Sequence, residues 1–152
     1  MTRFWKSWLT IWCVGVGVFG LVLYGAGFEA TTAPAAALFS AFGNPLPADP
    51  DRYLRFAIAL MGAVTFGWSV TYYAAFRAVW ALEPIASVAI WRILTLGAAI
   101  WYAIDSFASA ANGFPANVAS NTVVVIAYLI PLVATGLLRR PVAIRAPLPA
   151  RP

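Results

Sequence analysis

Histidine is absent from this sequence, and cysteine occurs only once. Without histidine, the chain lacks the usual axial ligand of b-type haem, the commonest transition-metal ligand and the default general base. The single Cys13 cannot form a disulfide within the chain, and a lone cysteine in an apolar run is more often a small hydrophobe than a nucleophile. We therefore expect a protein that is not an enzyme and that holds no metal and no cofactor.

Charged residues are also scarce, at 10% of the chain against 62% for hydrophobic residues. A soluble domain of this length carries about 25% charged residues. So few charges cannot cover a water-exposed surface, and lipid must be the main solvent. The formal net charge of +5 would suit nucleic acid. However, the basic residues flank apolar runs, where membrane topology explains them better, and we expect no nucleic-acid partner.

Four apolar runs are long enough to cross a membrane, which takes about 20 helical residues. We expect helices at about 8–28, 54–76, 84–108 and 118–138. The first run is too long for the core of a cleaved signal peptide, roughly 7–15 residues, and we expect it to be retained. The sequence thus predicts an all-α protein: one antiparallel four-helix membrane domain over residues 1–140, followed by a Pro- and Arg-rich tail at 141–152.

The positions of lysine and arginine predict the orientation, because cytoplasmic loops are enriched in both. With the N-terminus in the cytoplasm, only Arg52 and Arg55 lie on the outer side. The other eight of the ten basic residues lie inside: Arg3, Lys6, Arg77, Arg92, Arg139, Arg140, Arg145 and Arg151. Four spans then place both termini in the cytoplasm, and we expect a multi-pass protein of a bacterial cytoplasmic (inner) membrane.

The connections between the predicted helices differ in length. The inner loop at 77–83 is very short, so the second and third helices are expected to be antiparallel neighbours. The outer connection contains PAAALFSAFG at 34–43, which begins with proline and ends with glycine. It fits either a short interfacial helix, with Leu38, Phe39 and Phe42 in lipid, or an ordered apolar loop.

Small residues recur every four positions on the second helix, at Ala59, Ala63 and Gly67. This spacing lets two helix backbones approach closely. We expect the stripe to contact a neighbouring helix within the bundle. The alternative is that it is the face of a homodimer, which would make a second copy of the chain a partner beside the lipid bilayer.

Two residues are unusual for the interior of a membrane helix. Arg92 lies roughly 12 Å along the third helix. Its side chain can reach back to the interface and pair with Glu83 or a lipid phosphate, or it can serve as a functional cation inside the bundle. Trp68 lies near the middle of the second helix. It either fills the core, with its indole N–H donated to Thr65 or Thr71, or stacks on a ligand.

A group of polar residues follows at the outer end of the third helix. Asp105 has Ser109 one turn away on the same face. After a turn at 113–115 come Asn117 and Asn121, four residues apart. Antiparallel packing of the third and fourth helices is expected to bring Asp105, Ser109 and Asn121 together.

This polar cluster has two interpretations. In the structural one, Asn117 or Ser120 caps the fourth helix, and Asp105 accepts hydrogen bonds from Asn121 and from free backbone amides. In the functional one, Asp105 faces a cavity open to the periplasm and binds a cation, a proton or a polar ligand.

A resemblance to known proteins rests on four short stretches: GAVTFGW (62–68), the pair Trp91-Arg92, WYAIDS (101–106) and PANVASN (115–121). Together they are similar to a group of small, uncharacterised bacterial four-span membrane proteins, over about residues 60–135. The general plan also resembles DoxX-like membrane proteins, which are linked to oxidative and sulfur metabolism. The resemblance implies a four-helix bundle in a bacterial inner membrane. It implies no activity, and the chain lacks a redox pair of cysteines.

Three functional hypotheses follow from these observations. The leading one is a non-catalytic helper or subunit of a larger membrane assembly. The alternative is a small transporter or ligand-binding protein with a periplasmic pocket around Asp105. A membrane enzyme ranks third, because no nucleophile–base pair and no metal-ligand pattern occurs in the sequence.

Overall fold

The computed structural model describes residues 1–139, apart from the side chains of residues 84–86. Every secondary-structure element in this part of the chain is a helix, and it contains no strand. The elements are α1 (Arg3–Gly25), η1 (Glu29–Thr31), α2 (Ala33–Ala41), α3 (Arg52–Trp80), α4 (Pro84–Ala111), α5 (Pro115–Ala134) and η2 (Leu137–Arg139). Helices α1, α3, α4 and α5 are long and apolar enough to cross a membrane. The prediction of an all-α, four-span fold is confirmed. The predicted tail at 141–152 lies outside the described residues.

Several helices extend beyond their predicted bounds because polar residues continue them past the apolar runs. The predicted ends at 28 and 138 are wrong, because α1 ends at Gly25 and α5 at Ala134, just before Gly136 with its positive φ of 64°. Helix α1 begins at Arg3, and the Thr2 hydroxyl accepts a hydrogen bond from the Trp5 amide. Helix α3 begins at Arg52, and the Asp51 carboxylate before it accepts hydrogen bonds from the Tyr53 amide at 2.7 Å and the Leu54 amide at 2.9 Å. Such N-caps stabilise helix ends that a hydropathy profile does not include.

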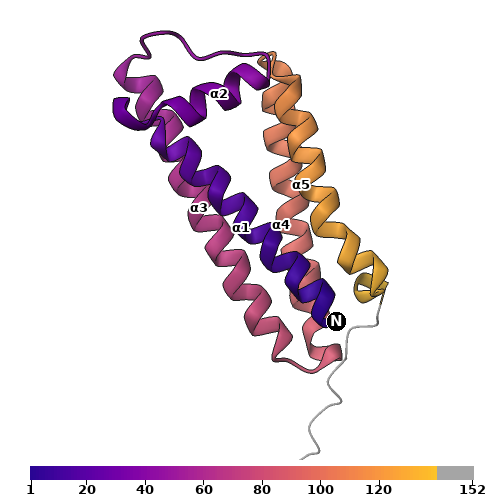
Figure 1. The fold of residues 1–152 in the computed structure, drawn as a ribbon. Helices are drawn as coiled ribbons and strands as arrows, with labels where there is room; N and C mark the ends of the chain where they lie inside the picture. The colour runs from indigo at the N-terminus through magenta and orange to yellow at the C-terminus, as the bar shows by residue number, and fades with distance from the viewer. Residues whose placement is uncertain (140–152) are drawn as a thin grey trace, which may run out of the picture.

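The four long helices form two pairs, which Figure 1 shows as the arms of a V. Helices α1 and α3 lie side by side and make the most extensive contact between elements. Their closest approach is at Gly20 and Gly62. A Cβ added at Gly62 would lie 2.5 Å from the carbonyl oxygen of Gly20. Only glycine allows the two backbones to come this close.

The contact predicted for the small-residue stripe on α3 is confirmed for Ala59 and is wrong for Ala63 and Gly67. A Cβ added at Gly67 meets no atom within 4 Å, and Ala63 is exposed. Ala59 alone faces a neighbour, since a Cβ added at Gly27 would come within 2.6 Å of it. Successive helical residues point about 100° apart. The face that packs on α1 is therefore the one through Gly62, and Ala63 and Gly67 point away from the bundle.

The two pairs meet at the end of the bundle that holds the N-terminus, the 81–83 connection and η2, here called the N-terminal end. An aromatic cluster joins them there. Trp12 of α1 lies 5.6 Å from Tyr128 of α5, and Phe76 of α3 stacks on Trp91 of α4 at 5.4 Å, measured between ring centroids. The Tyr72 hydroxyl also donates to the Leu94 carbonyl at 2.9 Å. Helices α3 and α4 are thus antiparallel neighbours, but mainly in this half of the molecule.

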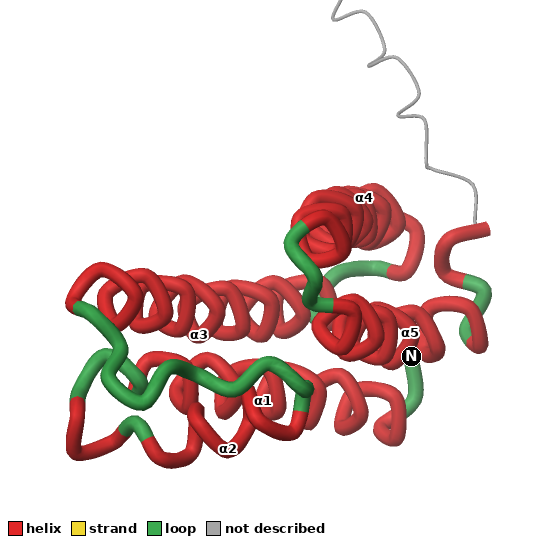
Figure 2. The backbone as a smooth tube through the Cα atoms, turned by 90° about the horizontal axis from the view of Figure 1, so that it is seen from above, coloured by secondary structure: helices red, strands yellow, loops and turns green. Residues whose placement is uncertain are grey.

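The opposite end, here called the α2 end, is where the V is open. The segment predicted as either an interfacial helix or a loop is helical, and α2 runs across the opening from the end of α1 toward α5 (Figure 1; seen from above in Figure 2). Ala35 is fully buried, and Leu38 and Phe39 pack on the cluster around it. The prediction that Leu38, Phe39 and Phe42 face lipid is wrong, because they face the inside of the V.

Candidate functional site: a roofed cavity with one carboxylate

A cavity of about 800 Å³ lies between the two helix pairs at the α2 end. Helices α1 and α3 form one wall and α4 and α5 the other, while α2 and the segment at 43–47 form the roof. The lining is mainly apolar and includes six aromatic side chains: Phe19, Phe39, Phe42, Trp68, Trp101 and Phe114. A volume of this size, an apolar lining and a few polar groups on one side are typical of small-molecule sites.

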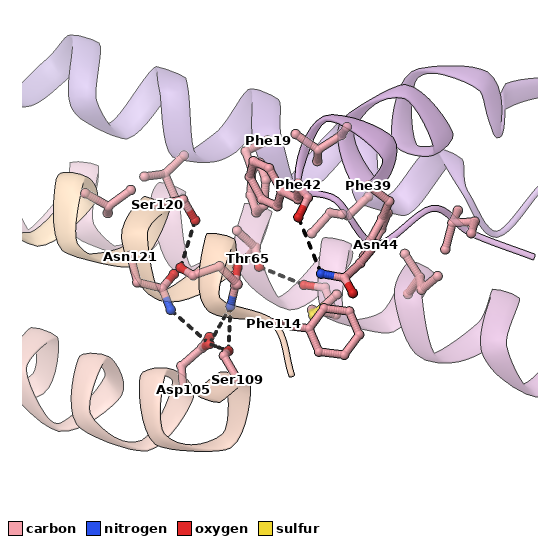
Figure 3. Close-up of a pocket in the computed structure, with 18 of the residues that line it drawn as sticks. Phe19, Phe39, Phe42, Asn44, Thr65, Asp105, Ser109, Phe114, Ser120 and Asn121 are labelled. Carbon is pink, nitrogen blue, oxygen red and sulfur yellow. Dashed lines mark hydrogen bonds between the residues drawn. The ribbon is translucent and has the colours of Figure 1, made fainter. Parts of the chain in front are cut away.

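The polar groups gather on the wall made by α4 and α5. Three donors converge on one carboxylate oxygen of Asp105, its Oδ1: the Ser109 hydroxyl at 3.1 Å, the Asn117 amide at 2.9 Å and the Asn121 amide at 3.0 Å. The Asn117 amide also donates to the Ser109 hydroxyl at 2.8 Å. Figure 3 shows the carboxylate pointing across to the Asn121 amide. The structure thus brings together all four residues of the predicted polar cluster.

The local backbone explains why these side chains meet. Gly113 takes a positive φ of 80°, and the amide of the next residue, Phe114, donates back to the Ser109 carbonyl at 2.8 Å. This is the pattern of a Schellman motif, which closes a helix and reverses the chain. Pro115 then occupies the first turn of α5, where its missing N–H costs nothing. The tight turn sets Asn117 and Asn121 opposite Asp105.

The details of the structural interpretation are wrong in two respects. Neither Asn117 nor Ser120 caps the fourth helix, because α5 begins earlier, at Pro115, with Phe114 in the cap position and no side-chain cap. The Ser120 hydroxyl instead donates to the Asn117 carbonyl. In addition, the donors to Asp105 are all side chains, and no backbone amide among residues 1–139 donates to it.

The second oxygen of Asp105, Oδ2, receives no hydrogen bond from residues 1–139. Because Asp105 is half-buried and lines the cavity, this oxygen is the acceptor left over for another group. Of its three donors, Asn121 is buried at 6% exposed, and Ser109 and Asn117 are half-buried. The carboxylate is thus fixed in position on one side and unsaturated on the other.

Trp68 belongs to both the aromatic cluster and the cavity wall. Its ring centroid lies 4.7 Å from that of Tyr72 and 5.1 Å from that of Trp101. The predicted hydrogen bonds from its indole N–H to Thr65 or Thr71 are not formed, and the two hydroxyls donate to carbonyls of their own helix. Within residues 1–139, neither Trp68 nor Trp101 donates its indole N–H to a protein acceptor.

Arg92 does not line the cavity. Its side chain is exposed and donates to the Leu138 carbonyl at 3.1 Å. It therefore reaches toward the N-terminal end, as expected for an arginine that extends to the interface. Among residues 1–139, no group of three or more Cys, Asp and Glu side chains is placed to hold a metal ion.

Sequence reasoning missed the opposite wall and the roof of the cavity. Phe19, Asn44 and Thr65 line it, yet each has an ordinary role in the sequence: a lipid-facing aromatic, a turn residue and a helical threonine. One available signal was the sequence FGNP at 42–45, because a glycine followed by asparagine and proline is typical of a sharp helix end. Gly43 has a positive φ of 76°, and the chain turns there over the cavity.

Comparison of the chain with protein-family models, with curated proteins and with solved structures found no match. The fold and the cavity therefore carry the functional argument.

Proposed function

We propose that this chain is a membrane protein that binds a small, mainly apolar molecule in the cavity, with one polar group of that molecule placed at Asp105. The single observation that carries this proposal is the roofed cavity of about 800 Å³ with an unsaturated carboxylate oxygen in its wall. A filled four-helix core would need no such space. Side-chain donors hold Oδ1 of Asp105, and Oδ2 has no donor within residues 1–139. The proposal includes no catalytic step.

The glycines of the bundle provide a clean test of this function. Gly15 lines the cavity, and a Cβ added there meets nothing within 4 Å. Gly15→Phe is thus expected to fill the cavity without pushing helices apart. Gly67 also has open space around it but lies outside the cavity, which makes Gly67→Phe the matched control.

The measurement is native mass spectrometry of full-length protein released from membranes in a mild detergent. The wild type and Gly67→Phe are expected to carry a bound small molecule that Gly15→Phe lacks. A wild type without bound mass, or the same lipid bound to all three proteins, would contradict the proposal.

The helper-subunit function is the second candidate, and the outward-facing stripe on α3 supports it. Ala63, Gly67 and Thr71 are exposed and could admit a helix of a second copy or of another membrane protein. Cross-linking of single cysteines at Ala63 and Gly67 in native membranes tests this candidate. If cysteines at both positions react with a labelling reagent and yet give no cross-linked product, the result argues against the helper-subunit function.

Location and orientation also belong to the proposal. Five of the seven basic residues among residues 1–139 lie at or reach toward the N-terminal end. They are Arg3 and Lys6 of α1, Arg77 at the end of α3, Arg139 of η2, and Arg92 of α4, which donates to the Leu138 carbonyl. The two others, Arg52 and Arg55, begin α3 at the α2 end. The positive-inside rule then supports an orientation with both termini in the cytoplasm and the cavity in the outer half of the membrane. The membrane that we propose is a bacterial inner membrane.

A further inference from the structure

The cavity has a charge as well as a shape, and we infer that its ligand is a hydrophobic organic cation, an ammonium-type group on an apolar body. This inference rests on the proposed function, since it names the ligand class of the same cavity. Among residues 1–139, Asp105 is the only charged residue that lines the cavity, and no basic side chain lines it. A carboxylate in an apolar site favours a cation and disfavours an anion.

The basic residues at the same end of the bundle are engaged elsewhere. Arg52 donates to the Tyr53 hydroxyl at 2.7 Å, and Arg55 donates to the Pro50 carbonyl at 3.0 Å and the Thr32 hydroxyl at 3.1 Å. No ion pair between Asp105 and a basic group occurs within residues 1–139. Within residues 1–139 this carboxylate therefore has no counter-charge.

The hydrogen bonds of Asp105 prepare it for a cation without supplying one. Three neutral donors on Oδ1 lower the cost of burying the carboxylate, but they do not cancel its charge. They also fix its rotamer, so the unsaturated Oδ2 is presented in one direction. A cation at Oδ2 would gain Coulomb attraction in a low-dielectric site where little water competes.

Aromatic rings supply the second element of a cation site. Trp101 lies four residues before Asp105, so the indole and the carboxylate project from the same face of α4. Trp68 of α3 lies against Trp101, with 5.1 Å between ring centroids, and both line the cavity. A cation over an indole ring is attracted by the negative face of the π system. Phe114 and Phe42 extend the apolar lining for the body of the ligand.

The test uses three ligands of one shape: (4-phenylbenzyl)trimethylammonium, its neutral carbon isostere 4-(2,2-dimethylpropyl)biphenyl, and the anion 4-phenylbenzylsulfonate. Binding to the full-length protein in nonionic detergent is followed by tryptophan fluorescence and by thermal shift. Protein-free micelles measure the partition into detergent, and Gly67→Phe controls for a phenylalanine added outside the cavity. We expect the cation to bind about tenfold more tightly than the neutral isostere, and the anion to bind most weakly.

Asp105→Asn isolates the charge, because an asparagine oxygen can still accept from Ser109, Asn117 and Asn121. This variant is expected to lose about tenfold in affinity for the cation and to bind the neutral isostere as the wild type does. Gly15→Phe is expected to abolish binding. Thr65→Phe places a ring in the cavity from α3 and replaces Gly15→Phe if that variant does not fold.

The outcomes separate the two proposals. Equal binding of cation and neutral isostere to the wild type, or an unchanged cation affinity in Asp105→Asn, overturns the cation inference and leaves the proposed function in place. Both the inference and the proposed function fail if none of the three ligands binds, or if binding persists in Gly15→Phe and Thr65→Phe.

Discussion

At the scale of single residues, one backbone carbonyl of α5 has no hydrogen-bond donor within its own helix, and a side chain of α1 supplies the donor. Pro131 lies inside α5 and has no N–H, so the carbonyl of Ala127 four residues earlier loses its usual donor. The Trp8 indole of α1 donates to that carbonyl at 2.8 Å. In an apolar environment an unpaired carbonyl is costly, so this one hydrogen bond ties α1 to α5 at the position where proline requires it.

This arrangement predicts an energetic coupling between Trp8 and Pro131. Trp8→Phe should lower the free energy of unfolding by about 1 kcal/mol, and by less in a Pro131→Ala background, where the restored amide serves the Ala127 carbonyl. Trp12→Phe is the matched control. The Trp12 indole donates to the Val124 carbonyl, which lies within α5 seven residues before the proline and keeps its own helical donor. Reversible unfolding in mixed micelles measures the double-mutant cycle, and additive effects of Trp8→Phe and Pro131→Ala would refute it.

The same scale yields a prediction for the stability of Asp105 variants. Asp105→Asn should change the free energy of unfolding by less than about 1 kcal/mol, because the acceptor for three donors remains. Asp105→Leu should destabilise the protein by roughly 2–4 kcal/mol, because it leaves the buried Asn121 amide without an acceptor and leaves Asn117 only the Ser109 hydroxyl. Thermal unfolding in one detergent compares the two. Equal stability of Asp105→Leu and wild type would show that the hydrogen bonds contribute nothing to the α4–α5 contact.

At the scale of helices, the contact between α1 and α3 depends on Gly62. An added methyl group would lie 2.5 Å from the Gly20 carbonyl oxygen, and backbone cannot move aside as a side chain can. Gly62→Ala is therefore expected to lower the free energy of unfolding by about 1–3 kcal/mol. Gly67→Ala, on the same helix with open space around it, should be neutral or slightly stabilising. Similar melting temperatures for the two variants would contradict the close approach.

The positions of the helices along the chain were predictable from the sequence. The rotation of each helix about its own axis, which decides the residues that face a neighbouring helix, was not. Hydropathy adds up residue by residue, so four spans follow from composition along the chain. The spacing of Asp105 and Ser109, together with a short turn, also suffices to bring them to Asn121. However, Gly62 and Ala63 are neighbours about 100° apart on one helix, and only packing decides which of them faces α1. The cavity depends on that rotation and on α2 folding inward, so no single stretch of sequence specifies it.

At the scale of the whole molecule, the two helix pairs have different tasks. The aromatic cluster at the N-terminal end holds the pairs together, with Phe76, Trp91 and Tyr128 among its fully or almost fully buried members. At the α2 end the pairs diverge, and the connection from α1 to α3 covers the gap with α2. A rigid contact at one end thus allows space for a ligand at the other, and the proposed orientation puts the α2 end on the outer side of the membrane.

This assignment is open to a direct test of topology. In a Cys13→Ala background, single cysteines replace Thr2 at the N-terminal end, and Asp49 and Asn112 at the α2 end; all three positions are exposed. Because the basic residues concentrate at the N-terminal end, a maleimide that does not cross membranes should label the Asp49 and Asn112 positions in intact cells. The Thr2 position should react only after the membrane is permeabilised. Labelling of Thr2→Cys alone would reverse the orientation and place the cavity in the cytoplasmic half, where its ligand would have to arrive from inside the cell.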